Sequence, residues 1–345
     1  MQTNYEKIII VGQGLCGTFL SMYLHLAGKE IVVYNLPKKN SSSIVTSGVI
    51  NPVTGRRIVR TWMIEEIMPF AVNTYQKVEQ LLQTSIIKQC NILDFHPTPQ
   101  MKIAFDDRIN EEPFLQKPSN QNQWNEYLNY HFGFGEINPC WQIDIQNLLQ
   151  SWREYLLTNR LLKEEYFSEE QINLHKNNLV IYCDGADNTT NSYFKLLPYA
   201  LNKGEALIAE INDLPRKNIY KQTCAIVPYK KDLWWIGSNY EWNFENDLPS
   251  NHFREDMEAR LKSFLKIPYK IVEHIAAIRP ANIERRPFIG FHPIHQNIGI
   301  LNGMGTKGCS LAPYFAHQFS NYIVQGTAIH SMADIKRFSG ILSKN

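Results

Sequence analysis

The chain has 345 residues, of which 44% are hydrophobic, and this suits a globular protein of two domains or of one large α/β domain with an insertion. Its formal net charge of +2 gives no whole-protein field that would attract nucleic acid or acidic lipid. The composition argues against a disordered chain, and we expect no nucleic-acid partner.

The cysteines, histidines and apolar runs limit the class of protein further. The six cysteines include no CxxC pair and the ten histidines no HExxH or HxH arrangement, so we expect no metal site. Residues 1–7 are polar and lead directly into a strand, unlike an export signal, and no apolar run is long enough to span a bilayer. We therefore expect a cytoplasmic protein with reduced thiols and no membrane span.

The first predicted elements form the opening of a βαβ unit. Residues 8–11 are a continuous apolar run, which predicts a strand buried on both faces of a parallel sheet. Residues 15–27 repeat apolar side chains at helical spacing and are followed by Gly28, which is suited to ending a helix. A second strand is predicted at residues 30–34. This order predicts a Rossmann-type α/β domain.

A glycine loop, Gly12-x-Gly14-x-x-Gly17, lies between this first strand and the helix. The first glycine permits a tight turn, the second lets the backbone approach a pyrophosphate, and the third lets the helix pack on the strand. Free N–H groups at the helix start, where Leu15 and Cys16 lie, attract phosphate together with the helix dipole. The loop therefore predicts a dinucleotide site, although a tight turn without a ligand would use the same glycines.

The end of the second strand lacks the acidic residue that usually receives the ribose hydroxyls of a dinucleotide. Tyr34 and Asn35 stand there, and no acidic residue follows until Glu65. Asn35 is a neutral replacement, because its amide also forms hydrogen bonds with hydroxyls. Lys38 and Lys39 leave two alternatives open: a pocket for the 2′-phosphate of NADP, or a solvated loop.

The middle of the chain alternates between two kinds of element. Residues 38–55 are predicted as a loop and residues 64–84 as a long helix. Residues 86–114 are predicted as short strands broken by Pro97 and Pro99, which is typical of an antiparallel region. The remaining expected elements are helices at 144–155 and 253–264, strands at 179–183, 206–211, 224–229, 233–237 and 298–301, and a final helix to about residue 324.

Parallel βα pieces thus lie at the start, middle and end of the chain, and antiparallel pieces interrupt them twice. This alternation predicts two discontinuous domains. The nucleotide-binding domain comprises residues 1–85, 140–200 and 275–345, and the substrate domain comprises residues 86–139 and 201–274.

Two clusters of small and polar residues are not explained by the first glycine loop. The first cluster, within residues 42–52, contains Ser42, Ser43, Thr46, Ser47, Gly48 and Val49. The second cluster, within residues 302–308, contains Gly303, Gly305, Thr306, Lys307 and Gly308. Together with Arg279-Pro280, Cys183-Asp184-Gly185-Ala186 and Lys203-Gly204-Glu205, they resemble in their order the D-amino-acid oxidase, glycine oxidase and sarcosine oxidase family of FAD enzymes.

This resemblance implies a Rossmann-type FAD-binding domain with an inserted antiparallel-sheet substrate domain. The first cluster would follow the pyrophosphate, ribityl chain and isoalloxazine, and Gly185 would lie beside the FAD. The helix that begins at Gly308 would point at the flavin pyrimidine edge, where its dipole stabilises the negative charge of reduced flavin. The cysteines that hold FAD covalently in some relatives have no equivalent here, so non-covalent FAD is implied. A close-packed glycine turn is the alternative for the last loop.

Arg279 and Tyr240 are the expected substrate residues. The matching arginine of the family holds the substrate carboxylate, and a planar guanidinium is suited to two parallel hydrogen bonds. The alternative is a structural ion pair with Glu273 or Glu284. Some relatives carry a tyrosine at the position of Ala225, and Tyr240 is a candidate replacement from the next strand, unless it is an ordinary core or surface tyrosine.

The resemblance implies an enzyme that oxidises the C–N bond of an amine or amino acid by hydride transfer to flavin, with oxygen or an unknown acceptor. An NAD(P)-dependent reductase is one alternative. Another is a flavoprotein related to tRNA wobble-uridine modification, because residues 48–62 are similar to the oxidase half of such enzymes and contain Arg56, Arg57 and Arg60. Since the rest of the chain is not basic, contacts with FAD phosphates or with water explain this cluster as well.

Overall fold

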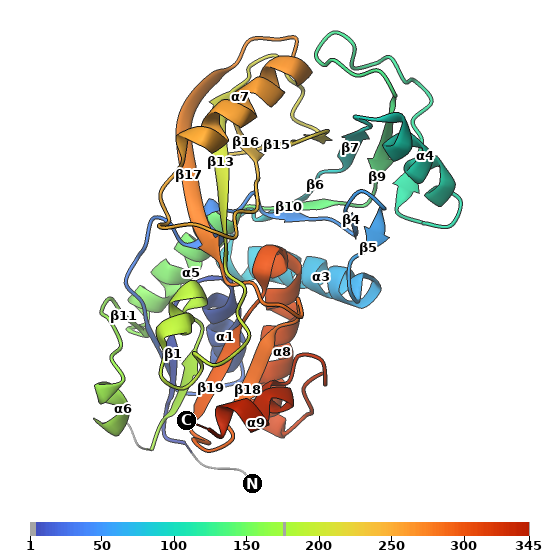
Figure 1. Ribbon diagram of the computed structural model, residues 1–345. Helices are drawn as coiled ribbons and strands as arrows, with labels where there is room; N and C mark the ends of the chain where they lie inside the picture. The colour runs from blue at the N-terminus through green and yellow to red at the C-terminus, as the bar shows by residue number, and fades with distance from the viewer. Residues whose placement is uncertain (1–4, 175–176, 345) are drawn as a thin grey trace.

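The computed structural model describes residues 5–174 and 177–344, and it shows a mixed α/β molecule with two main sheets, one above the other in Figure 1. The lower, six-stranded sheet has the order β11-β2-β1-β12-β19-β18. Its neighbouring strands are parallel except for the antiparallel pair β18–β19. The strands are β1 (Ile8–Val11), β2 (Ile31–Tyr34), β11 (Leu162–Lys163), β12 (Leu179–Tyr182), β18 (Phe288–Phe291) and β19 (Ile298–Asn302).

The six-stranded sheet is covered on both faces, which explains why its strands are apolar throughout. On one face, Ile10 packs in the same cluster as Phe19 of α1 (Leu15–Leu26) and Phe315 of α8 (Gly308–Gln325). On the other face, Ile9 packs in a second cluster with Phe194, Ile335 and Phe338, which lie outside the sheet. The helices α1 and α8 lie side by side, although they come from opposite ends of the chain (Figure 1).

The upper, eight-stranded sheet has the order β17-β13-β16-β15-β14-β7-β9-β8 and is antiparallel except for the pair β14–β7. On one face, Leu207 and Ile236 pack against Leu261 and Phe264 of α7 (Asn251–Phe264). The strands are β7 (Ile92–Phe95), β8 (Leu115–Gln116), β9 (Phe134–Ile137), β13 (Asn202–Glu210), β14 (Ile219–Lys221), β15 (Ala225–Pro228), β16 (Leu233–Gly237) and β17 (Lys270–Arg279).

Smaller elements lie between and around the two sheets. A three-stranded sheet has the order β3-β10-β6, and β4 pairs with β5. These strands are β3 (Val49–Ile50), β4 (Val53–Thr54), β5 (Val59–Arg60), β6 (Ile87–Gln89) and β10 (Trp141–Ile143). The other helices are α2 (Ser42–Val45), α3 (Ile64–Leu82), α4 (Pro99–Arg108), α5 (Ile145–Thr158), α6 (Glu170–Leu174) and α9 (Ser339–Leu342), with 3-10 helices at Gly185–Thr190, Gly305–Lys307 and Ile335–Phe338.

The structure confirms the predicted α/β architecture but corrects two local expectations. Helix α4 stands where only short strands were expected, because Pro99 begins a helix rather than breaking a strand. Thr98 caps this helix, its hydroxyl accepting a hydrogen bond from the Met101 N–H at 3.3 Å. The expected loop at residues 38–55 contains α2, β3 and β4.

Residues 1–4 of the polar start, and residue 345, lie outside the described residues. Within the part of the chain that the structure describes, no helix combines the length and apolar character needed to cross a membrane.

Candidate active site

A large cavity lies where the two main sheets meet, with a volume of about 2120 Å³. Its wall is formed by the loop after β1, residues 34–51, the turn after β12, the end of β17 and the loop before α8. Cavities for drug-sized ligands measure roughly 300–1,000 Å³. This cavity therefore has room for a dinucleotide together with a second, smaller molecule.

The glycine loop has the predicted strand–turn–helix geometry. Gly12 has φ +98°, and a Cβ there would lie 2.7 Å from the Cys183 carbonyl oxygen. A Cβ at Gly17 would lie 1.9 Å from the Gly12 carbonyl oxygen, so this glycine serves the packing of α1 on β1 and does not line the cavity. Gly14, Leu15 and Cys16 do line it, at the N-terminus of α1. The backbone thus presents N–H groups to the cavity, as a phosphate site requires.

Asn35 lies at the end of β2 and lines the cavity. Its side-chain oxygen accepts a hydrogen bond from the Gln13 N–H at 3.0 Å, which leaves the amide NH₂ for a ribose hydroxyl. Lys38 and Lys39 also line the cavity, but Lys38 forms an exposed ion pair with Asp187. Lys38 is therefore not a free cation, and the two lysines do not form an unpaired site for a 2′-phosphate.

The first small-residue cluster forms one wall of the cavity through Ser42, Ser43, Thr46, Ser47 and Val49. The Ser43 hydroxyl accepts a hydrogen bond from the Leu15 N–H at 3.1 Å, which joins this wall to the glycine loop.

Gly48 has a different role from its neighbours in this cluster. A Cβ there would lie 1.9 Å from the Ile143 carbonyl oxygen, and the residue does not line the cavity. Its small size serves the crossing of two chain segments.

The turn after β12 adds an acidic residue that the sequence analysis did not single out as a site residue. Asp184 and Gly185 line the cavity, and the Asn302 side chain donates to the Gly185 carbonyl at 2.9 Å. Burial raises the pKa of Asp184 to about 7, although the Asn188 amide donates to its carboxyl at 2.8 Å and opposes the shift. Asp184 is therefore an ionisable group beside Gly12 that changes charge near neutral pH.

The loop before α8 places Gly305, Thr306, Lys307 and Gly308 on the cavity wall. A Cβ at Gly308 would lie 3.2 Å from the Leu15 side chain, so the N-termini of α8 and α1 meet at the cavity. Both helix dipoles add positive potential there.

Two residues of the second cluster differ in their position: Lys307 lines the cavity and Gly303 does not. Burial, together with the nearby positive charges of Arg285 and Arg286, lowers the pKa of Lys307 to about 8. Gly303 does not line the cavity; a Cβ there would lie 2.9 Å from the Asn282 amide nitrogen, so this glycine serves packing.

Arg279 ends β17 and lies in the cavity wall. Its Nη1 donates to Asn202 Oδ1 at 2.8 Å and to the Asn239 carbonyl at 3.0 Å, and its Nη2 donates to Ser238 Oγ at 2.9 Å. The guanidinium lies flat against Gly204, where a Cβ would stand 1.8 Å from Nη2. The pKa of Arg279 is lowered by burial.

Arg279 takes part in none of the ion pairs of residues 5–174 and 177–344, so a structural ion pair with Glu273 or Glu284 is not present. Glu284 is paired instead with Arg337, at 2.9 Å. All three hydrogen-bond partners of Arg279 are neutral, and its Nε–H and second Nη2–H make no hydrogen bond with the described residues. A half-buried cation with a free donor edge is suited to binding an anion.

Tyr240 lines the rim of the cavity and is 57% exposed. The Arg279 guanidinium carbon lies 5.0 Å from the centre of the Tyr240 ring, which is cation–π distance. Tyr240 thus covers Arg279 from the solvent side rather than standing in a strand.

The arginine cluster, Arg56, Arg57 and Arg60, does not line the cavity, although Thr54 and Thr61 on either side of it do. Arg60 pairs with Glu65 and with Glu112, at 2.9 Å for the second, and Arg56 and Arg57 are exposed. None of the three arginines lines the cavity, and the charge of Arg60 is already compensated by two carboxylates.

The residues that hold Arg279 were not found from the sequence as site residues. Asn202, Ser238 and Asn239 come from two strand ends that are distant in the chain, and only the strand pairing brings them together. The nearest signal was the Lys203-Gly204-Glu205 motif, whose glycine lies under the guanidinium.

Residues 7–321 match the DAO family, described as FAD dependent oxidoreductase, and the chain belongs to this family. Among individual relatives, glycine oxidase of Bacillus subtilis (strain 168) is 28% identical over 125 residues. That match spans 35% of this chain and about a third, 34%, of the relative. The membership confirms a flavin-dependent oxidoreductase and excludes the NAD(P)-dependent alternative.

Solved structures show the same fold along nearly the whole chain. Glycine oxidase from Geobacillus kaustophilus and L-proline dehydrogenase from P. horikoshii each have a TM-score of 0.75 at 15% identity, covering 97% of this chain and 98% of theirs. Iminodiacetate oxidase from Chelativorans sp. BNC1 has a TM-score of 0.74 at 14% identity, and the match covers 94% of this chain and 96% of the oxidase. At these identities the likeness concerns the fold.

Proposed function

We propose that this enzyme oxidises the C–N bond of an amine that carries a carboxylate, such as an amino acid. The observation that carries the proposal is Arg279: a half-buried guanidinium in the cavity wall, held by neutral partners and with a free donor edge. The names of the similar proteins, which include oxidases and a dehydrogenase of amino acids, support it.

The cavity fits FAD as its cofactor. The space above Gly14 and the N–H groups at the start of α1 suit the pyrophosphate, and Asn35 suits the ribose. The thiols at the cavity are poor nucleophiles, because burial raises the pKa of Cys16 and Cys309 to about 12 and that of Cys183 well above its usual value. We therefore propose non-covalent FAD, which when bound supplies the hydride acceptor.

The protein residues bind and orient the substrate. The Nε–H and free Nη2–H of Arg279 are suited to the two oxygens of one carboxylate, which fixes the orientation of the bond to be oxidised. Tyr240 covers this pair and reduces its exposure to water. Lys307, whose pKa is about 8, and the N-terminus of α8 supply positive potential in the same cavity.

The proposed domain division corresponds to the two main sheets except at residue 275, which lies within β17 of the upper sheet. Residues 1–85, 140–200 and 275–345 would form the FAD-binding unit, and residues 86–139 and 201–274 the substrate unit. The free state of all six cysteines supports the expectation of a reducing, cytoplasmic compartment.

The proposal is tested by a visible spectrum followed by a substrate screen. We expect flavin absorption bands, release of FAD by acid or heat, and turnover of one class of carboxylate-bearing amine. Hydrogen peroxide formation would identify oxygen as the acceptor, and dye reduction without peroxide would identify a dehydrogenase. Turnover restricted to amines without a carboxylate would contradict the proposal.

A first prediction concerns the pH dependence of FAD affinity. A neutral Asp184 tolerates the pyrophosphate anions and a charged one repels them, so FAD binding should take up a proton and weaken as pH rises through about 7. We expect affinity to fall by up to about tenfold per pH unit between about pH 7 and pH 8.5, measured by fluorescence titration of apoprotein.

Two variants test this assignment. Asp184→Asn should bind FAD with little dependence on pH. Asp213→Asn, a change in an exposed carboxylate that does not line the cavity, should keep the dependence of the wild type. An unchanged pH profile in Asp184→Asn would assign the proton to another group.

A second prediction concerns Gly204. Because a Cβ there would stand 1.8 Å from Arg279 Nη2, Gly204→Ala forces the guanidinium to move. We expect normal FAD content and a loss of carboxylate affinity of about tenfold to a hundredfold, measured by spectral titration with an unreactive carboxylate. Unchanged carboxylate affinity in Gly204→Ala would show that the position of the Arg279 guanidinium against Gly204 is not needed for binding.

A further inference from the structure

The segment that holds Arg279 in place has little regular structure of its own. Ser238 Oγ and the Asn239 carbonyl accept hydrogen bonds from the guanidinium, and Tyr240 covers it. This segment, residues 238–250, runs from the end of β16 to the start of α7 without a helix or a strand. Its position therefore depends on contacts with neighbouring elements.

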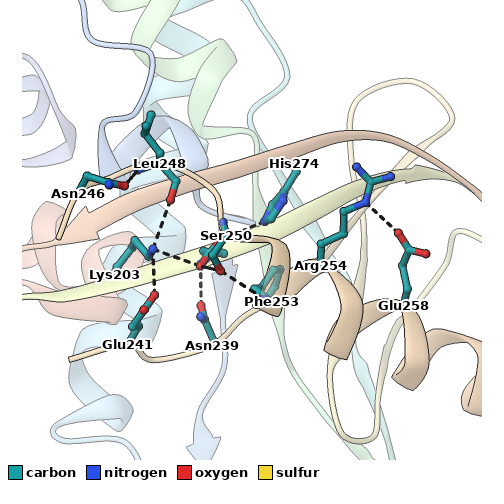
Figure 2. Close-up of polar contacts among 11 residues, drawn as sticks. Lys203, Asn239, Glu241, Asn246, Leu248, Ser250, Phe253, Arg254, Glu258 and His274 are labelled. Atoms are coloured by element: carbon teal, nitrogen blue, oxygen red, sulfur yellow. Dashed lines mark hydrogen bonds and ion pairs between the residues drawn. The ribbon is translucent and has the colours of Figure 1, made fainter. Parts of the chain in front are cut away.

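Strand β13 fastens the middle of the segment through Lys203 (Figure 2). The Lys203 N–H donates to the Glu241 carbonyl at 2.8 Å, and the Glu241 N–H donates back at 3.0 Å. The Lys203 ammonium lies 2.9 Å from the Glu241 carboxylate and donates to the Leu248 carbonyl at 3.3 Å. One buried lysine thus contacts two separate points of the segment.

Glu205 fastens both ends of the same segment. At the far end, its carboxylate accepts hydrogen bonds from the Ser250 N–H at 2.6 Å and the Ser250 hydroxyl at 2.8 Å. At the near end, its backbone N–H donates to the Asn239 side-chain oxygen at 2.8 Å. Glu205 is 0% exposed, so these contacts do not compete with water.

The buried carboxylate is compensated by neighbouring groups. The Lys203 ammonium lies 3.4 Å from Glu205, and His274 Nε2 lies 2.9 Å from it. Burial opposes the charged form of Lys203, but the hydrogen bond with Glu241 and the attraction of both carboxylates outweigh this, so the pKa of Lys203 is raised. The group is therefore a charged network, and removing one member leaves the others uncompensated.

This network and Arg279 lie on opposite faces of β13. Side chains alternate along a strand, so Lys203 and Glu205 point to one face, while Gly204 presents the other face to the guanidinium. Neither charged residue touches Arg279. Their influence on it passes through residues 238–250.

We propose that Glu205, together with Lys203, is a positioning residue that sets the geometry of Arg279 by fixing residues 238–250. This inference rests on the proposed role of Arg279 as the carboxylate receptor. All three residues of the Lys203-Gly204-Glu205 motif would then serve the position of Arg279. Gly204 leaves the space in which the guanidinium packs, and the two charged residues hold the segment that contains its hydrogen-bond acceptors Ser238 and Asn239.

The test compares Glu205→Gln with Asp94→Asn in the FAD-loaded protein. Asp94 is a matched control, because it is a buried carboxylate in the same sheet, 2.9 Å from Lys221, with β16, β15 and β14 between its strand and β13. Two quantities are measured: hydrogen exchange of residues 238–250 by mass spectrometry, and binding of an unreactive carboxylate from the flavin spectrum.

For Glu205→Gln we expect exchange in residues 238–250 to be faster by about tenfold or more. Carboxylate affinity should fall by about tenfold to a hundredfold, with unchanged FAD content. Asp94→Asn should match the wild type in both measurements. If Glu205→Gln does not fold, Ser250→Ala keeps the carboxylate, removes one donor and should give a smaller change in the same direction.

Each contrary result has a separate meaning. Unchanged exchange in Glu205→Gln, or faster exchange with unchanged carboxylate affinity, would overturn the positioning role alone. Equal losses in Glu205→Gln and Asp94→Asn would also overturn it, because the effect would then be general destabilisation. If Arg279→Ala binds the carboxylate as tightly as the wild type, Arg279 is not the carboxylate receptor. Both the proposed function and the positioning role of Glu205 would then be contradicted.

Discussion

Gly14→Val is expected to give a folded protein that has lost its FAD. A Cβ at Gly14 would lie 3.0 Å from the Ser43 hydroxyl, which accepts the hydrogen bond from Leu15 N–H at the start of α1. A branched side chain there occupies the approach of the pyrophosphate and displaces Ser43 as well. We expect FAD content, measured by absorption and by release of the cofactor, to fall to about a tenth or less of the wild type.

Gly340→Val is the matched control for this prediction. A Cβ at Gly340 has no heavy atom within 4 Å, so the same substitution meets open space. It should leave FAD content unchanged. Normal FAD content in Gly14→Val would mean that the loop is a structural turn and that the cofactor binds elsewhere in the cavity.

Arg279 substitutions should have the second large effect, on substrate rather than cofactor. Arg279→Ala removes the charge and should cost about 2–5 kcal/mol of carboxylate binding. That is a loss of about 30-fold to several-thousandfold in affinity. Arg279→Lys keeps the charge but lacks the two-pronged geometry, so its loss should be smaller but clear. Both variants should retain FAD and its visible spectrum, and spectral titration with a carboxylate analogue measures the effect.

Arg337 provides the control for this series. It forms the kind of ion pair that Arg279 lacks, lying 2.9 Å from Glu284. Arg337→Lys should lower thermal stability without changing carboxylate affinity. If the Arg279 variants behave in the same way, losing stability but keeping affinity after correction for the folded fraction, Arg279 is structural and the substrate need not carry a carboxylate.

The βαβ opening and the two glycine loops could be predicted because their signals are local. An apolar run, a glycine spacing and a helical repeat within residues 8–34 suffice to specify β1, α1 and β2. Helix α4 was missed for the opposite reason. Pro99 is compatible with both a broken strand and a first helical turn, and the Thr98 cap decides between them.

The surroundings of Arg279 could not be predicted, because they depend on strand pairing. Asn202 faces Arg279 across β13 and β17, and Ser238 follows β16 on the other side of β13. The roles of Gly17, Gly48 and Gly303 were also not separable in the sequence. A glycine that approaches a ligand and a glycine that is needed for close packing look the same in a sequence. Gly17 and Gly48 let two backbones cross, and Gly303 makes room for the side chains of Asn282 and Phe288.

The meeting of α1 and α8 at the cavity has a consequence for the synthesis of the protein. The glycine loop leaves the ribosome early, but the residues that complete the floor of the cavity, Gly305 to Gly308, are made only near the end of the chain. At about 5–20 residues per second, the two are separated by on the order of 15–60 s of translation. A growing chain therefore passes most of its synthesis without a complete flavin site. FAD capture belongs to the last stage of folding, and the supply of FAD then shifts the yield of finished enzyme through binding to the completed fold.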